Sequence, residues 1–428
     1  MQAIENVRAY RCRKLVTSAS ACGALIAGIL THAPASAEWE VVPDIGLNAH
    51  SEENPRLNPD TLVTDTSAAT SAVLSATANI SSIEQRGSFA FAPSVISYQY
   101  VDEKDSELES TDWFLNGSGE YRWQTVNAGF RADFSRERLL NSEVVSVDPD
   151  GNPDTDGPDA ADSGRLAFIS GQRERYWLNP YLGLTVSERN TLRLEIVEDR
   201  ISFTEGDLAV RTGYDNTRFS AGIHRNVDDR NVVSATMSVE SFKTDQDLNN
   251  TDTVTIEGAF ARPVTELWTF NFAAGVLRSE FEFLGNNQQQ VARATTDYTM
   301  RLGLRKRSER SRINMDLTRE VYPSTSGFSA IRREFIVFYD RDLRQRLNAS
   351  FGIRLDDSAS LGDINVQDDR EYARAELDFT WAIKPTWFLD AGYAYTAQDF
   401  TEDLIQQKTS SNSVYIGISY RGLSKTRR

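Results

Sequence analysis

The sequence has 428 residues, of which 46 are Lys or Arg and 62 are Asp or Glu, so its formal net charge is −16. This balance argues against nucleic acid as a partner, because a phosphate backbone attracts basic surfaces and repels acidic ones. The two cysteines, Cys12 and Cys22, both lie near the N-terminus. The rest of the chain therefore has no disulfide and no Cys-based metal site.

The N-terminal segment is typical of a secretory signal peptide. Its positive region contains four basic residues: Arg8, Arg11, Arg13 and Lys14. Residues 15–30 are apolar or small, and Ala-Ser-Ala at 35–37 is a small-x-small cleavage site. We expect cleavage after Ala37 and a single mature domain over residues 38–428. Because the signal also holds one acid, Glu5, its removal takes away a net +3 and leaves a mature charge of −19.

A lipoprotein signal with Cys22 as the lipidated residue is the competing interpretation of this segment. Ala19 stands where such signals usually place Leu, and the apolar run continues past Cys22 to Leu30. After Leu30 no stretch approaches the roughly 18 apolar residues that a membrane helix needs. A transmembrane strand needs only about 9–11 residues, of which alternate ones face lipid, so this composition still fits a membrane β-barrel.

Apolar and polar residues alternate in one segment after another along the mature chain. The pattern is clear in 191–198, 267–276 and 372–381, where for example Ala373, Ala375 and Leu377 alternate with charged residues. Similar rows occur in 126–134, 233–239 and 347–355. A period of two predicts strands with one apolar and one wet face.

The connections between these segments alternate in length. Nine are long: 50–66, 102–112, 139–174, 199–216, 243–252, 279–293, 319–330, 356–370 and 397–410. Eight are short: 84–87, 124–125, 187–190, 226–231, 262–266, 306–311, 342–346 and 384–386. This alternation predicts an all-β fold: a transmembrane antiparallel up-and-down barrel of about 18 strands, with 16–20 as the range. Its short turns would be periplasmic and its long loops extracellular.

The positions of the tryptophans give a partly independent indication. Four of them adjoin short turns: Trp123, Trp268, Trp381 and Trp387. Together with Trp39 and Tyr420 near the two ends of the mature chain, they predict one interfacial girdle at the periplasmic side. Trp113 and Trp177 would then mark the outer rim. The competing interpretation is that these are ordinary core residues of a sheet.

If the apolar faces meet lipid, the opposite faces line the interior and carry many charges. The expected lumen-facing charges are Arg131, Asp133, Arg193, Glu195, Glu240, Glu257, Arg301, Arg305, Arg354, Arg374, Glu376 and Asp378. A barrel of 16–18 strands is wide enough to hold water unless something fills it. Such charges would bias which solutes pass. The alternative is that they pair across the wall and simply satisfy a polar interior.

The connection 139–174 contains the chain's one metal-like pattern. Acidic and amide side chains alternate there with other residues: Asp148, Asp150, Asn152, Asp154 and Asp156. Carboxylates at every second position can wrap Ca²⁺, but Ser163 stands where a calcium loop has its bidentate Glu. A solvated acidic loop is the favoured interpretation over a calcium site, and no other cofactor is expected.

The mature sequence does not indicate an enzyme. It has two histidines, His50 in or near the first outer loop and His224 beside a short turn. No G-x-S-x-G pattern and no phosphate-binding Gly loop occurs. A hydrolase acting through His50 remains as the enzymatic alternative.

Both ends of the mature chain resemble a known group of proteins. Residues 38–43 (Glu-Trp-Glu-Val-Val-Pro), 51–57 and 414–421 are similar to the first and last strands of β-barrel porins associated with exopolysaccharide and exosortase (PEP-CTERM) systems of Gram-negative bacteria. The resemblance implies a role in passing or anchoring surface polysaccharide and transfers no site residue. One departure is the basic tail 421–428, which follows Tyr420 where barrels commonly end on an aromatic residue.

These observations favour a porin-like channel in the bacterial outer membrane, accessory to exopolysaccharide export. The alternative is a non-conducting structural or surface-interaction barrel that acts through its acidic extracellular loops. The expected partners are outer-membrane lipid and lipopolysaccharide, the outer-membrane assembly machinery and polysaccharide export components.

Overall fold

The computed structural model describes residues 39–55, 68–138, 171–206, 212–244, 249–284, 290–324, 329–361, 370–402, 405–423 and 425–427. Eighteen long strands and one short strand account for most of them. They are β1 (Trp39–Glu52), β2 (Ala69–Ile83), β3 (Gly87–Tyr100), β4 (Ser110–Arg122), β5 (Val126–Arg138), β6 (Gly171–Ser187), β7 (Asn190–Gly206), β8 (Tyr214–Asn226), β9 (Val232–Thr244), β10 (Asn249–Pro263), β11 (Trp268–Leu284), β12 (Gln290–Arg307), β13 (Ser311–Pro323), β14 (Ser329–Arg344), β15 (Leu347–Ser360), β16 (Arg370–Lys384), β17 (Trp387–Glu402), β18 (Ile405–Arg421) and β19 (Lys425–Arg427). The expected signal peptide, residues 1–37, lies outside the described residues.

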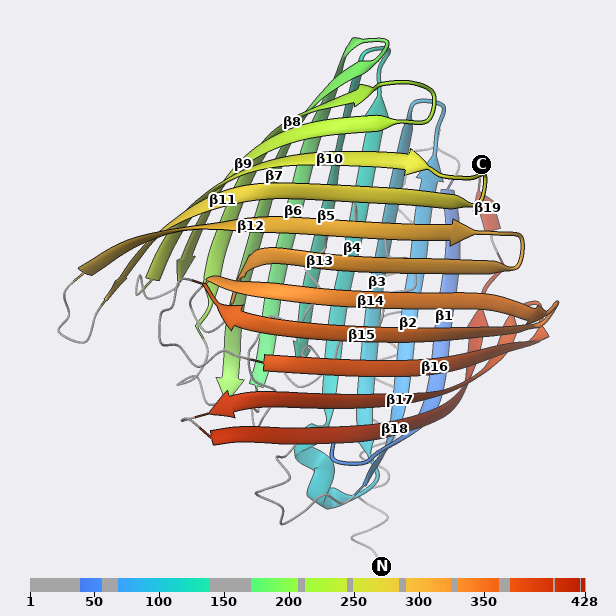
Figure 1. Ribbon diagram of the computed structural model, residues 1–428. Helices are drawn as coiled ribbons and strands as arrows, with labels where there is room; N and C mark the ends of the chain where they lie inside the picture. Colours follow the sequence, from blue (N-terminus) through green and yellow to red (C-terminus); the bar gives the residue numbers. More distant parts are fainter. Residues whose placement is uncertain are drawn as a thin grey trace, which may run out of the picture.

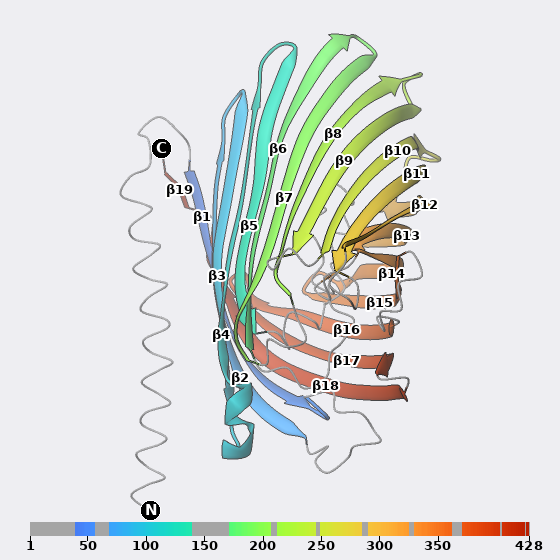
Figure 2. The ribbon, with the colours of Figure 1, turned by 90° about the vertical axis from the view of Figure 1, so that its left-hand side faces the viewer.

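The long strands form one closed antiparallel barrel. Each of β1–β18 pairs with its neighbours in the chain, and β18 returns to pair with β1 from Asp44↔Arg421 to Glu52↔Ser413. Figure 1 shows β10–β18 crossing in front of β1–β7, and Figure 2 shows the curved wall from the side. The basic tail is part of this closure, because β19 continues the last strand along the start of β1 at Trp39↔Arg427. The prediction of an 18-stranded barrel is confirmed.

The strands are longer than the alternation of apolar residues indicated. β7 continues to Gly206 and β17 to Glu402, although connections were expected from 199 and from 397. Only residues 403 and 404 separate β17 from β18. The reason is that beyond residue 199 the outward row of β7 becomes polar, as at Arg200, while an apolar residue, Ile201, lies on the inward row, so the apolar row changes face although the backbone ladder continues.

The outer wall is a belt of exposed apolar side chains. Ile45 is 48% exposed, Ile256 59%, Val276 60% and Ile416 56%. In water such a wall would be far larger than the apolar patches that soluble proteins tolerate. In hydrocarbon it is the stable arrangement, since the strand ladders pair the backbone groups of each strand with its neighbours.

The two ends of the belt differ chemically. At the periplasmic end aromatic rings lie beside the short turns: the Tyr121 and Trp123 centroids are 4.5 Å apart, and those of Trp387 and Tyr420 are 5.2 Å apart. At the other end outward-facing ion pairs replace apolar residues, such as Arg200–Asp215 at 3.1 Å. No helix in the described parts of the chain is long and apolar enough to cross a bilayer.

We expect Ile256→Lys to destabilise the barrel, because it places an ammonium group on the lipid face near the middle of β10. The free energy of unfolding from lipid vesicles, measured by urea titration, should fall by about 2–4 kcal/mol. Ile256→Leu is the matched control and should leave it nearly unchanged. Equal stability of the lysine variant would contradict a lipid-facing position.

The periplasmic turn between β8 and β9 gives a pH-dependent prediction. The Asp228 carboxylate accepts hydrogen bonds from the backbone N–H groups of Arg230 (2.8 Å) and Asn231 (2.7 Å) and from the Asn231 side-chain amide (2.6 Å). These bonds lower the pKa of Asp228 below its ordinary value. Its contribution to stability is therefore present above the unfolded-state pKa of about 3.9 and is lost as pH falls through the lower folded-state pKa. Asp228→Asn should be less stable than wild type at neutral pH, and chemical denaturation should show this difference shrinking towards pH 2.

Candidate functional site

The inward-facing row of each strand lines the lumen. The expected lumen charges lie on β5, β7, β9, β10, β12, β15 and β16, and each occupies the row opposite the apolar row of its strand: Arg131, Asp133, Arg193, Glu195, Glu240, Glu257, Arg301, Arg305, Arg354, Arg374, Glu376 and Asp378. Their outward neighbours are exposed, with Phe130 at 38%, Ile196 at 41% and Leu302 at 38%. The period of two therefore shows that these charged residues face the lumen. Their effect on which solutes pass stays a prediction.

Many of these charges have partners inside the lumen. Arg193 lies 3.1 Å from Glu195, and Arg374 lies 3.1 Å from Glu376. The Tyr415 hydroxyl donates to Asp378 at 2.7 Å. Arg354 pairs with both Glu334 and Asp356. Such pairing keeps the lumen charged without leaving isolated buried charges, which would be costly.

A cavity of about 330 Å³ lies against the β6–β13 side of the lumen. Hydroxyl groups are its most frequent lining: Ser220, Ser234, Thr236, Ser238, Thr251, Thr253, Thr255, Thr299, Thr318 and Ser329. The register explains the space, because Ser220, Ser238 and Thr255 are cross-strand neighbours and their side chains are short. Arginines and glutamates interrupt the hydroxyls, among them Arg218, Arg301, Glu240 and Glu257. This lining offers both hydrogen-bond donors and acceptors at close spacing.

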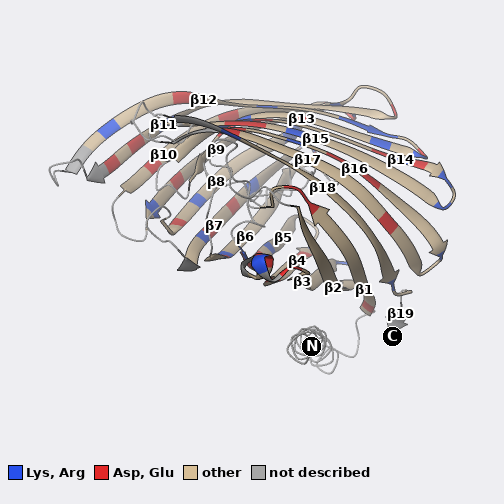
Figure 3. Ribbon diagram, turned by 90° about the horizontal axis from the view of Figure 1, so that it is seen from below, with Lys and Arg blue, Asp and Glu red and all other residues tan. Residues whose placement is uncertain are grey.

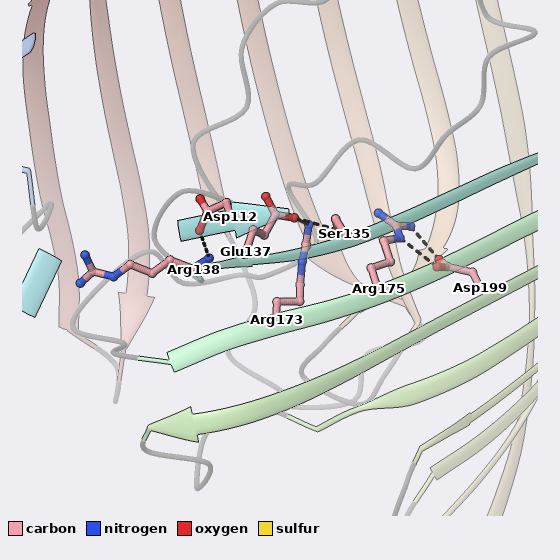
Figure 4. A network of polar contacts seen from close by, with 7 residues as sticks. All are labelled: Asp112, Ser135, Glu137, Arg138, Arg173, Arg175 and Asp199. Atoms are coloured by element: carbon pink, nitrogen blue, oxygen red, sulfur yellow. Dashed lines mark hydrogen bonds and ion pairs between the residues drawn. The ribbon is translucent and has the colours of Figure 1, made fainter. Parts of the chain in front are cut away.

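Towards the extracellular end, β4–β8 carry a buried polar network (Figure 4). Arg175 makes two hydrogen bonds to the Asp199 carboxylate, at 2.9 and 2.7 Å, and Arg173 lies 2.9 Å from Glu137. The Asp112 carboxylate accepts from the backbone N–H of Arg138 at 3.1 Å. This network is not among the site residues expected from the sequence, because Arg173 and Asp199 fall in segments expected to be connections. The alternation Arg173, Arg175, Trp177 was the signal that could have revealed it.

Next to the network the lumen face turns apolar. Buried apolar side chains on inward rows of β6–β9 and β11 include Trp177, Val197, Ile201, Tyr214, Phe242, Leu277 and Phe281, none more than 6% exposed. Tyr214 and Phe242 stack with centroids 5.3 Å apart. The expectation that Trp177 marks the outer rim of the lipid-facing wall is wrong, since Trp177 faces inward and is 4% exposed. Alternation shows which residues share a face, but not what packs over that face.

The wall loosens between β12 and β13 above the apolar belt. These strands share eight register pairs, from Met300↔Arg319 to Arg307↔Arg312, against seventeen between β11 and β12. Where pairing stops, the Arg319 guanidinium donates to the Tyr298 carbonyl and lies 2.9 Å from Asp297. Arg319 thereby satisfies a carbonyl that no longer has a ladder partner.

The remaining candidate residues do not gather into one site. His50 lies on β1, near the end of that strand at Glu52, and its register partner on β18 is Tyr415. His224 lies on β8 and lines the hydroxyl-rich cavity. The candidate calcium residues Asp148, Asp150, Asn152, Asp154 and Asp156 lie outside the described residues. Within the described ranges, no group of three or more His, Cys, Asp or Glu residues is placed to hold a metal ion.

Comparisons with known proteins return similar structures but no similar sequence. No family model matches the chain, and no curated protein matches it. Among solved structures it is similar to OccK2 (OpdF) of Pseudomonas aeruginosa, at 10% identity over 90% of this chain and 98% of that chain, with a TM-score of 0.44. It is also similar to the outer membrane protein OpdK of Pseudomonas aeruginosa, at 9% identity over 90% of this chain and 99% of that chain, with a TM-score of 0.43. A third similar structure is OccAB2 of Acinetobacter baumannii, at 9% identity over 90% of this chain and 98% of that chain, with a TM-score of 0.43.

The geometry of the chain itself decides its environment. A closed antiparallel ring of eighteen strands has an apolar belt outside and charged rows inside. The chain is an outer-membrane β-barrel. The outer membrane fixes the orientation, with the short turns of the barrel in the periplasm and the polar network at the extracellular end.

The Arg175–Asp199 pair should contribute strongly to the stability of this extracellular end. Asp199→Asn leaves a buried guanidinium uncompensated and should lower the free energy of unfolding by about 3–5 kcal/mol. The exposed outward pair Arg200–Asp215 offers a matched control, since Asp215→Asn should cost less than about 1 kcal/mol. Urea unfolding of both variants from vesicles measures the difference, and equal losses would contradict the buried role.

Proposed function

We propose that this barrel is a porin-like channel for hydrophilic solutes, accessory to the export of surface polysaccharide. The observation that carries the channel proposal is the hydroxyl-rich cavity on the lumen side of β8–β13. The export role is supported by the resemblance of residues 38–57 and 414–421 to the first and last strands of exosortase-associated barrels.

The lining of the cavity suits polyhydroxylated solutes. Ser and Thr hydroxyl groups both donate and accept hydrogen bonds, so they can exchange partners with water and with sugar hydroxyls as a solute moves. Thr253 and Ser279 already share such a bond at 2.8 Å. The ion-paired side chains nearby, such as Arg193 with Glu195, add a transverse field without a large net charge.

A second function is supported by the buried apolar residues at the extracellular end. Trp177, Tyr214 and Phe242 face the lumen yet are at most 4% exposed, so their side chains are covered on this part of the inner wall. Close packing on the inner wall favours a non-conducting barrel that binds partners through its acidic extracellular connections. Lipopolysaccharide, the outer-membrane assembly machinery and polysaccharide export components are the partners we propose under either function.

Planar-bilayer recording separates the two functions. Under the channel proposal the purified, folded barrel shows discrete ohmic conductance steps, and Trp177→Ala raises the step size because it removes a large ring from the wall of the cavity. Trp113→Ala is the matched control: it removes a tryptophan from the outward row and should leave the step size unchanged. A folded barrel without conductance would overturn the channel proposal.

Deleting residues 145–164 gives the second arm of this test. Under the channel proposal the conductance persists and binding of cells or extracted polysaccharide to the barrel is unaffected. Loss of that binding with normal folding supports the surface-interaction function instead.

A further inference from the structure

The periplasmic edge of β12–β14 has a charge pattern opposite to that of the whole chain. Residues 305–312 read Arg-Lys-Arg-Ser-Glu-Arg-Ser-Arg, which places five basic residues and one acid in eight positions of a chain with net charge −16. Figure 3 shows blue bands towards the turn ends of β13 and β14. Arg341 on β14 adds a further cation, because it pairs in register with Ser311 of this turn.

Part of this basic cluster lines an open groove on the outer wall. The groove is bordered by Lys306, Ser308, Arg310, Ser311, Ile313, Met315, Val337, Tyr339 and Arg341. Its upper part is apolar, from Ile313, Met315 and Val337, and its lower part carries the three cations. Met315, on this outward row, is 36% exposed, which is consistent with a lipid-facing wall.

The groove lies at the level of the membrane interface. Trp268, Lys306, Ile313 and Tyr339 form one cross-strand row, so the lysine lies between an aromatic residue of the girdle and an apolar neighbour. The Lys306 ammonium is 5.5 Å from the centre of the Trp268 ring. Aromatic and long cationic side chains together are typical of the boundary where acyl chains meet headgroups.

Two cations on the same rim are paired with acids, whereas the cations of the groove have no ion pair among the described residues. Elsewhere Arg421 lies 3.1 Å from Asp44, and Arg122 pairs with Glu120. Within the described ranges, no carboxylate forms an ion pair with Lys306, Arg310 or Arg341. A cluster of unneutralised cations above a turn requires a mobile counterion or a bound anionic group.

We propose that this groove binds the phosphate headgroup of an anionic phospholipid from the periplasmic leaflet. The acyl chains would lie along Ile313, Met315 and Val337, and the phosphate between Lys306, Arg310 and Arg341. A lipid fits better than a free anion because the apolar half of the groove is continuous with the belt. Basic pockets beside membrane-spanning segments are a recurring means of holding anionic lipids.

Native mass spectrometry of the full barrel in detergent, titrated with phosphatidylglycerol, cardiolipin or phosphatidylcholine, tests the proposal. Wild type should retain the two anionic lipids and not phosphatidylcholine. The triple variant Lys306→Gln, Arg310→Gln, Arg341→Gln should bind anionic lipid roughly tenfold more weakly. The matched control, Arg225→Gln, Arg230→Gln, Arg262→Gln, removes the same charge from the periplasmic edge of β8–β10 and should bind like wild type.

A charge-preserving triple variant, Lys306→Arg, Arg310→Lys, Arg341→Lys, separates a folding defect from lost recognition and should restore binding. Equal retention of anionic lipid by the two triple glutamine variants would overturn the proposed site. Equal retention of phosphatidylcholine, or displacement of lipid by millimolar inorganic phosphate, would overturn the choice of an anionic lipid as the occupant. Conductance plays no part in this measurement, so its result is independent of the proposed function.

Discussion

The structure depends on one constraint: within hydrocarbon every backbone N–H and C=O must find a partner in the protein. Each unsatisfied group there costs several kcal/mol. An open strand edge would carry a whole row of such groups, so its total cost would be much larger. Pairing β18 with β1 removes that edge. In the described strands the ladder ends early between β12 and β13, and it is also interrupted on the β2 side of Pro93 and on the β7 side of Pro180, because proline has no N–H to donate.

Closure also determines what the side chains can do. Each strand must direct one row of residues outwards into lipid and the other inwards, so apolar and charged residues that alternate in sequence are separated by the whole thickness of the wall. Because Ile256 and Ile416 face lipid, the next residues along their strands, Glu257 and Gly417, must face the interior. The inward charges are stable because pairs such as Arg374 with Glu376 neutralise one another at short range.

The lumen is not uniform along its axis. Short hydroxyl side chains on β8–β10 leave a cavity, whereas Arg173, Arg175 and Asp199 form a buried network towards the outside. Trp177 and Phe242 fill the lumen face beside that network. Trp177 and Phe242 also border the cavity, so the lining of its wall changes from hydroxyl groups to apolar rings beside the network.

The sequence by itself determined the strand count and the face of each strand, because a wall between lipid and a polar interior imposes a period of two on every strand. The sequence correctly placed Arg193 and Ile196 on opposite faces of one strand, and it correctly placed both ends of the barrel sequence beside short turns. Only the tertiary structure decided that Trp177 faces inward, that strands continue past 199 and 397, and that Arg175 meets Asp199. Those outcomes depend on which inward rows are covered and which distant side chains face each other across strands. The alternation of apolar and polar residues within one segment is the same whether or not its inward row is covered, so the sequence pattern cannot reveal these contacts.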